Sequence, residues 1–129
     1  MAAPYTLTKL TEVEDSAQKF GHGEHQEARF ATKELKTERT GVSYHRVKPN
    51  MRQAFGHRHE QAEEVYVVLS GSGRVKLDDE IVELEPLDAL RVSPGVTRQF
   101  EGGPHGLEFL AFGPHVPGDG EILPDWWKD

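Results

Sequence analysis

Turn-forming residues divide the middle of the chain into short extended segments, and this spacing restricts the folds available to it. Between residues 41 and 113 they recur every 6 to 12 positions, with β-branched and aromatic residues in the intervals. Such intervals are typical of antiparallel strands. We therefore predict an all-β sandwich or barrel of seven or eight strands. Strands are expected at 28–35, 41–47, 64–69, 74–77, 81–84, 89–92, 96–100 and 107–112, with turns at 70–73, 78–80, 86–88 and 93–95 and a loop at 101–104.

The two ends of the chain lack this pattern. Thr11 and Glu14 have the spacing of a helix capping box, and Gly21 is a suitable stop, so a short N-terminal helical turn is expected. The last residues are expected to form an irregular tail that ends in Trp126 and Trp127. We divide the chain into an N-terminal extension (1–27), a barrel (28–113) and a C-terminal tail (114–129) that packs on the barrel or on a partner subunit.

Composition excludes several classes of function. The chain has 129 residues, which is the size of one domain. It contains no cysteine, so a metal would have to be bound by histidine, aspartate or glutamate. The formal net charge of −7 argues against a nucleic-acid surface, which needs a basic patch. No apolar run is long enough to cross a membrane, and the N-terminus lacks the pattern of a secretory signal. We expect a cytoplasmic protein.

The segment GHRHEQAEE contains the candidate site. His57 and His59 are two residues apart, so on a strand they share one face while Arg58 points away. Glu64 lies at an odd offset, but a turn at 60–63 can reset the alternation. Two histidines and a carboxylate are a common ligand set for Fe, Mn, Ni or Zn. A bare histidine pair is also common in polar surface turns, so these residues alone leave both interpretations open.

The same residues belong to a longer pattern. His57-x-His59, followed by Glu64 and then by Gly71, resembles the first motif of the cupin superfamily, and PLDALRVSPGVTRQFEGG resembles a degenerate second motif. The resemblance covers about residues 28–113. It implies a double-stranded β-helix, a jelly-roll barrel made of two packed antiparallel sheets. It also implies that His57, His59 and Glu64 hold one divalent metal (Fe, Mn, Ni or Zn) at the barrel centre.

One departure from the family pattern affects this site directly, because Arg98 stands where the second motif places its last metal-binding histidine. A guanidinium cannot ligate a metal and would repel one, but it can pair with Glu64. Two states compete: a three-ligand metal site in which Arg98 bends away or holds an anionic substrate, and a metal-free pocket with an Arg98–Glu64 pair. If Arg98 faces solvent, this competition disappears. The chain departs from the family motifs at four other positions. Met51 and Leu87 each replace a motif glycine, Ser93 replaces a proline, and Gly102 replaces an asparagine.

Three functions remain open. The first is a small-molecule-binding cupin with a divalent metal; as an enzyme it would be a metal-dependent dioxygenase, isomerase or lyase acting on a small anionic compound. The second is a metal-free, non-catalytic metabolite-binding or sensing module. The third is a structural partner that binds through the tail. Small cupins are commonly homodimers, and the strand at 28–35 could pair with a second copy. The candidate ligand-binding residues are Arg98, Tyr66, His45 and Phe100.

Overall fold

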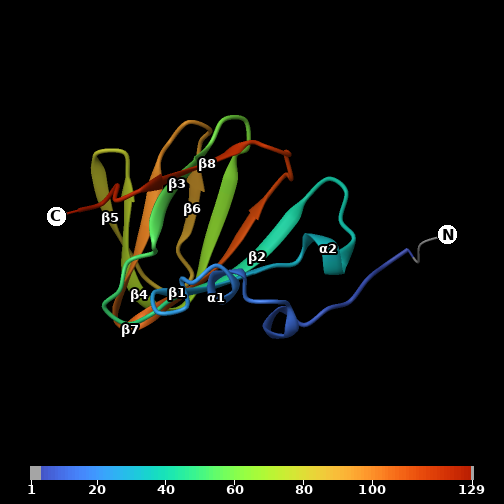
Figure 1. Cartoon of the computed structure of the whole chain (residues 1–129), viewed down its shortest axis with the longest axis horizontal. Helices are drawn as coiled ribbons and strands as arrows, with labels where there is room; N and C mark the ends of the chain where they lie inside the picture. Colours follow the sequence, from blue (N-terminus) through green and yellow to red (C-terminus); the bar gives the residue numbers. More distant parts are fainter. Residues whose placement is uncertain (1–3, 129) are drawn as a thin grey trace.

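Eight antiparallel strands form the body of the fold in the part of the chain that the computed structural model describes, residues 4–128 (Figure 1). The all-β prediction is confirmed. The segments 41–47 and 89–92 have the predicted bounds, because turn-forming residues begin or flank each of them. The strands are β1 (Gln26–Phe30), β2 (Gly41–Val47), β3 (Phe55–His59), β4 (Glu64–Leu77), β5 (Glu80–Leu84), β6 (Ala89–Val92), β7 (Arg98–Gly113) and β8 (Gly120–Pro124).

The two longest strands, β4 and β7, connect the two layers of the barrel. Residues 65–71 of β4 pair with 107–112 of β7, and 73–77 pair with 98–102. One layer continues from β7 to β2 and β1, and the other continues to β3 and β8. Inward-facing side chains from both layers form one core. Its buried members are Val47, Tyr66, Val68, Val75, Leu84, Val92, Phe100, Leu107, Phe109 and Ala111.

The turn predicted at 70–73 and the loop predicted at 101–104 are wrong, because the chain bends at both places without leaving the sheet. Residues 70–73 lie within β4, where the pairing with β7 shifts register twice. Gly71 has a φ of 77°, and a Cβ there would lie 2.1 Å from the carbonyl oxygen of Gly106. The glycines therefore allow the paired strands to approach closely and to bend. In the local sequence, such a run of glycines looks the same as a turn.

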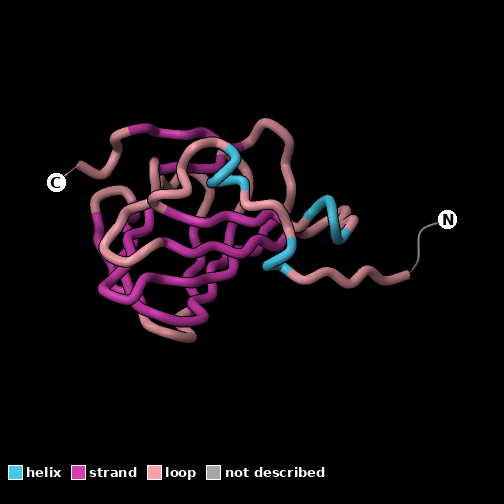
Figure 2. The backbone as a smooth tube through the Cα atoms, turned by 60° about the horizontal axis from the view of Figure 1, so that its bottom comes forward, coloured by secondary structure: helices cyan, strands magenta, loops and turns pink. Residues whose placement is uncertain are grey.

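The N-terminal part differs from its prediction in two places. The strand expected at 28–35 ends at Phe30, and the helix α2 (Thr32–Leu35) follows. The expected helical turn is split into the 3₁₀ helix η1 (Leu10–Glu12) and the helix α1 (Ser16–Lys19). The cap of α1 is Asp15, whose carboxylate accepts from the backbone N–H of Ala17 and of Ala28. The short helices lie outside the strand body (Figure 2), and none in residues 4–128 is long and apolar enough to cross a membrane.

The tail is more regular than predicted. Its strand β8 pairs with β3 from Phe55↔Pro124 to His59↔Gly120, and the two strands run side by side in Figure 1. After β8, Trp127 is only 5% exposed and lies under the guanidinium of Arg52, whose carbon is 4.1 Å from the ring centroid. The tail thus packs on the barrel of its own chain. A strand partner 61 to 69 residues away leaves no local pattern, so sequence reasoning missed β8.

Candidate metal and ligand site

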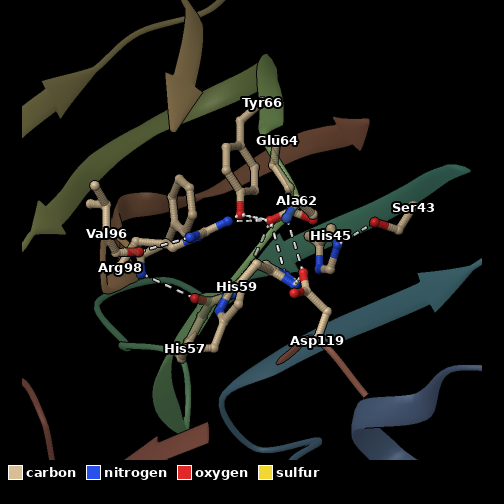
Figure 3. Close-up of polar contacts among 12 residues, drawn as sticks. Ser43, His45, His57, His59, Ala62, Glu64, Tyr66, Val96, Arg98 and Asp119 are labelled. Atoms are coloured by element: carbon tan, nitrogen blue, oxygen red, sulfur yellow. Dashed lines mark hydrogen bonds and ion pairs between the residues drawn. The ribbon is translucent and has the colours of Figure 1, made fainter. Parts of the chain in front are cut away.

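His57, His59 and Glu64 point toward one another from β3 and β4 (Figure 3). The Nε2 atom of His57 lies 3.7 Å, and that of His59 3.5 Å, from Oε1 of Glu64. One ligand atom from each residue lies within 4.8 Å of the other two. The alternation expected along β3 explains the shared face, because the intervening Arg58 faces out and contacts Glu121 at 2.9 Å. The structure thus brings together the three residues that the sequence predicts as ligands.

Asp119 holds the turn that places Glu64 on the same side as the histidines. Its carboxylate oxygens accept hydrogen bonds from the backbone N–H groups of Gln61 (2.7 Å) and Ala62 (3.0 Å). These bonds fix the segment between β3 and β4, where the alternation of side chains is reset. Sequence reasoning missed Asp119, because an aspartate between two glycines in the tail carries no recognisable motif.

The same carboxylate also faces the imidazole of His59. Oδ2 of Asp119 lies 3.3 Å from Nδ1 of His59, although the alignment falls short of a regular hydrogen bond. Burial acts to raise the pKa of Asp119, but backbone hydrogen bonds from Ala62 and Gln61 outweigh it and hold the pKa below its usual value. An ionised carboxylate at Nδ1 favours a proton on that nitrogen and leaves the Nε2 lone pair for a metal.

Arg98 is completely buried and points into the cluster. Its Nη2 donates to Oε1 of Glu64 at 2.6 Å, its Nε to the hydroxyl of Tyr66 at 3.1 Å, and its Nη1 to the carbonyl oxygen of Val96 at 2.8 Å. The side chain has 0% exposure. Its donors are therefore directed at protein groups, and the ligand-binding role expected for Arg98 stays a prediction.

The charge states follow from this packing. Burial acts to raise the pKa of Glu64, but contacts with His57, Tyr66 and Arg98 outweigh it and lower the pKa, so the carboxylate is ionised. The hydroxyl of Tyr66 donates to Oε1 of Glu64 at 2.5 Å. Burial and the charge of Glu64 raise the pKa of Tyr66, which keeps the phenol protonated. Burial lowers the pKa of His57, which keeps its imidazole neutral and able to ligate.

A cavity of about 650 Å³ adjoins the cluster. Its wall includes Tyr66, Phe100 and His45, three of the four candidate ligand-binding residues. His45 is buried, its Nε2 lies 2.7 Å from Oγ of Ser43, and its ring stacks on Phe109 at 5.0 Å between centroids. Burial lowers the pKa of His45 to about 4, so the ring is neutral at physiological pH. The cavity wall thus combines aromatic rings with polar side chains, among them the three candidate metal ligands.

These residues fit a divalent metal. Bonds of about 2.1 Å in tetrahedral or octahedral geometry place ligand atoms roughly 3.0–3.4 Å apart, close to the 3.5 Å and 3.7 Å observed here. Two imidazoles and an ionised carboxylate supply three donors and leave further positions open. The guanidinium of Arg98 opposes a cation but also holds Glu64 in place.

Fold and site together define a class: a small two-layered antiparallel barrel with a His-His-Glu cluster. The model of the cupin domain family matches residues 43–109, which is more than half of the sequence. The chain therefore belongs to the cupin family, as the motif resemblance predicts. No curated protein matches the sequence.

Solved structures show the same fold. A cupin protein from Bacteroides fragilis is 23% identical, with a TM-score of 0.72 over 91% of this chain and 89% of that one. The polyketide cyclase RemF from Streptomyces resistomycificus is 22% identical, with a TM-score of 0.73 over 96% and 87% of the two chains. Oxalate decarboxylase from Bacillus subtilis is 20% identical, with a TM-score of 0.76 over 97% of this chain and 34% of that one. At these identities the likeness concerns the fold alone.

Proposed function

We propose that this cupin binds a small anionic molecule at a divalent metal ion held by His57, His59 and Glu64. The observation that carries the proposal is the convergence of these three side chains within 4.8 Å at the edge of a cavity. The 3.3 Å contact of Asp119 with His59 adds the carboxylate–histidine arrangement that orients metal-binding imidazoles.

The balance of charge favours an anionic ligand. When the two imidazoles ligate a metal as neutral rings, the carboxylates of Glu64 and Asp119 and the guanidinium of Arg98 contribute one net negative charge. A divalent ion would reverse that sign within a largely buried site. A carboxylate or enolate in the open coordination positions would then neutralise the remaining charge.

In this proposal the protein residues have distinct roles. Arg98 and Tyr66 hold the carboxylate of Glu64 by hydrogen bonds of 2.6 Å and 2.5 Å, so they are positioning residues. Phe100 forms part of the aromatic wall of the cavity. A bound divalent ion would supply Lewis-acid polarisation of a ligand carbonyl. Oxygenation, isomerisation and lyase chemistry are all consistent with this donor set.

The names of two structural neighbours agree with small-molecule chemistry in such a barrel. RemF is a polyketide cyclase and the Bacillus subtilis protein is an oxalate decarboxylase. Because one fold supports many reactions, they support the general class of ligand and no specific substrate.

A second function is favoured by a specific observation, the 2.6 Å contact between Arg98 and Glu64. In this alternative the ion pair replaces the metal, and the cavity binds a metabolite without catalysis. The contact is the pairing that the metal-free interpretation of the sequence requires.

Elemental mass spectrometry of untagged protein separates the two. We expect metal at close to one ion per chain in wild type and its loss in His59→Ala. Arg58→Ala is the matched control, because Arg58 lies on the same strand but faces outward. Absence of metal from wild type after loading with Fe, Mn, Ni and Zn in turn would overturn the metal proposal and support the metal-free module.

Homodimer formation also stays a prediction. β1 lies at one end of the strand order, so its outer edge has no strand partner within the described residues. Antiparallel pairing with β1 of a second copy would satisfy that edge. Size-exclusion chromatography with light scattering should give twice the chain mass of 14.5 kDa. A mass of one chain over the whole accessible concentration range would contradict it.

A further inference from the structure

His45 is the buried titratable residue that the proposed metal chemistry does not use. It lies on β2, where Ser43, His45 and Val47 face inward. The side chain is 9% exposed and borders the cavity. Figure 3 draws its ring with Ser43 on one side and the metal cluster on the other.

Only one of its two ring nitrogens has a hydrogen-bond partner. Nε2 of His45 lies 2.7 Å from Oγ of Ser43, whereas Nδ1 is buried and has no partner among the residues that the structure describes. A buried polar atom without a hydrogen-bond partner destabilises the folded chain, because it has lost its hydration without compensation. An apolar side chain would fill the same space beside Phe109 without this cost, so packing alone does not account for a histidine here.

We propose that His45 and Ser43 form a ligand subsite beside the metal cluster, which accepts a hydroxyl or carbonyl group of the bound ligand. The Ser43 hydroxyl can donate to or accept from Nε2, so Nδ1 can correspondingly donate to a carbonyl oxygen or accept from a hydroxyl. A neutral imidazole selects uncharged polar groups, because a second carboxylate would stay desolvated without a counter-charge.

The body of the ligand follows from the aromatic part of the cavity wall around His45. Phe100 stacks on Phe109 at 4.4 Å, and the rings of Phe30 and His45 meet in a T-shaped arrangement at 5.4 Å between centroids. Such walls favour a flat, largely apolar ligand. The subsite therefore deepens the proposed function, on which it rests for the anionic end, and names the ligand class as an aromatic or conjugated acid that carries a hydroxyl or carbonyl group.

Matched probes isolate the subsite. Benzoate is compared with 3-hydroxybenzoate and 4-hydroxybenzoate. Each adds one hydroxyl group, at a different distance from the carboxylate. Affinities are measured by titration calorimetry or ligand-observed NMR, on protein stripped with a chelator and on protein loaded with Zn²⁺. We expect at least one hydroxybenzoate to bind wild type about 5-fold more tightly than benzoate, as one added hydrogen bond provides.

Three variants test the assignment. His45→Phe should abolish the hydroxyl preference while benzoate affinity stays within about 2-fold, since the aromatic wall is kept. His45→Gln replaces the imidazole by an amide, which can also donate and accept hydrogen bonds, so this variant should keep part of the hydroxyl preference. It also tests the subsite if His45→Phe folds poorly. His105→Phe is the matched control, because His105 is exposed and does not line the cavity.

The outcomes separate this subsite from the metal proposal. A hydroxyl preference that His45→Phe removes in chelator-stripped protein supports the subsite even if no metal binds. Absence of any preference in wild type, or a preference unchanged in both His45 variants, overturns the subsite even if metal binding is confirmed.

Discussion

Nη2 of Arg98 and Oε1 of Glu64 are 2.6 Å apart, and the same carboxylate oxygen is the one that both candidate metal-binding histidines approach. The oxygen therefore belongs to an ion pair and to a ligand cluster at once. The 0% exposure of Arg98 makes this arrangement a fixed part of the barrel interior. Whether a cation can join it determines which of the two proposed functions applies.

Replacing Arg98 by methionine should destabilise the metal-free protein. The ionised carboxylate of Glu64 would lose its guanidinium partner in a largely buried site, and breaking such a pair costs about 3 kcal/mol. We expect the free energy of unfolding in urea to fall by that amount. Arg91→Met is the matched control, because Arg91 is exposed and should change it by less than about 0.5 kcal/mol. Equal stability of Arg98→Met and wild type would contradict the structural role of the pair.

The same variant should bind metal more tightly. Removing the guanidinium removes repulsion of a cation and releases Oε1 of Glu64 from its 2.6 Å contact. We expect the Zn²⁺ affinity of Arg98→Met to rise at least 10-fold, measured by competition with a fluorescent chelator. An unchanged or weaker affinity would show that the benefit of holding Glu64 in place outweighs the repulsion between Arg98 and the cation.

Asp119→Asn should weaken metal binding without unfolding the chain. The amide oxygen can keep one of the two hydrogen bonds from the backbone N–H groups of Gln61 and Ala62, and the charge beside Nδ1 of His59 is lost. Loss of such a partner typically lowers metal affinity about 10-fold or more. Glu121→Gln is the control, an exposed carboxylate close by in β8. If both variants bind Zn²⁺ as wild type does, Asp119 has no orienting role.

Glu101 should make stability depend on pH in the acidic range. Burial acts to raise its pKa, but hydrogen bonds from Arg52 and Arg74 outweigh this and hold the pKa below its usual 4.5. Because the folded pKa is lower than the unfolded one, the stabilisation is present above about pH 4.5 and is lost as the pH falls through the folded value. Glu101→Gln should therefore cost about 1 kcal/mol at pH 7 and much less at pH 3.

Urea unfolding at the two pH values checks this dependence. The exposed Glu80→Gln serves as control for the loss of one carboxylate. A Glu101→Gln effect of equal size at pH 3 and pH 7 would exclude the ionised contacts with Arg52 and Arg74 as its cause.

Trp127→Ala should loosen the tail and weaken the metal site with it. The indole is 5% exposed, and Nη1 of Arg52 donates to its backbone carbonyl at 3.0 Å. Truncating a buried tryptophan costs about 3 kcal/mol. Because β8 connects this anchor to Asp119, we expect lower Zn²⁺ affinity as well. Trp126→Ala is the control, because Trp126 is only half-buried and its truncation should have smaller effects. Equal metal affinity in wild type and Trp127→Ala would show that the tail does not support the site.

Local sequence was sufficient for much of this structure. Turn residues on both sides of 89–92 mark that strand, and side-chain alternation places His57 and His59 on one face. These features depend on neighbours along the chain, so they can be recognised without the fold. Leu87, which replaces a motif glycine, still adopts a φ of 70°, so the turn at this position is retained without the glycine.

Only the tertiary structure decided the environment of the site. Asp119 reaches His59 because β8 pairs with β3, and Arg98 is buried because β7 lies beside both β3 and β4. Likewise His45 borders the cavity only once β1, β2 and β7 close one layer around it. The sequence determined which side chains could ligate a metal and the face from which they project. The folded barrel determined which charges meet them, since burial and long-range strand pairing fix both the partners and the protonation states.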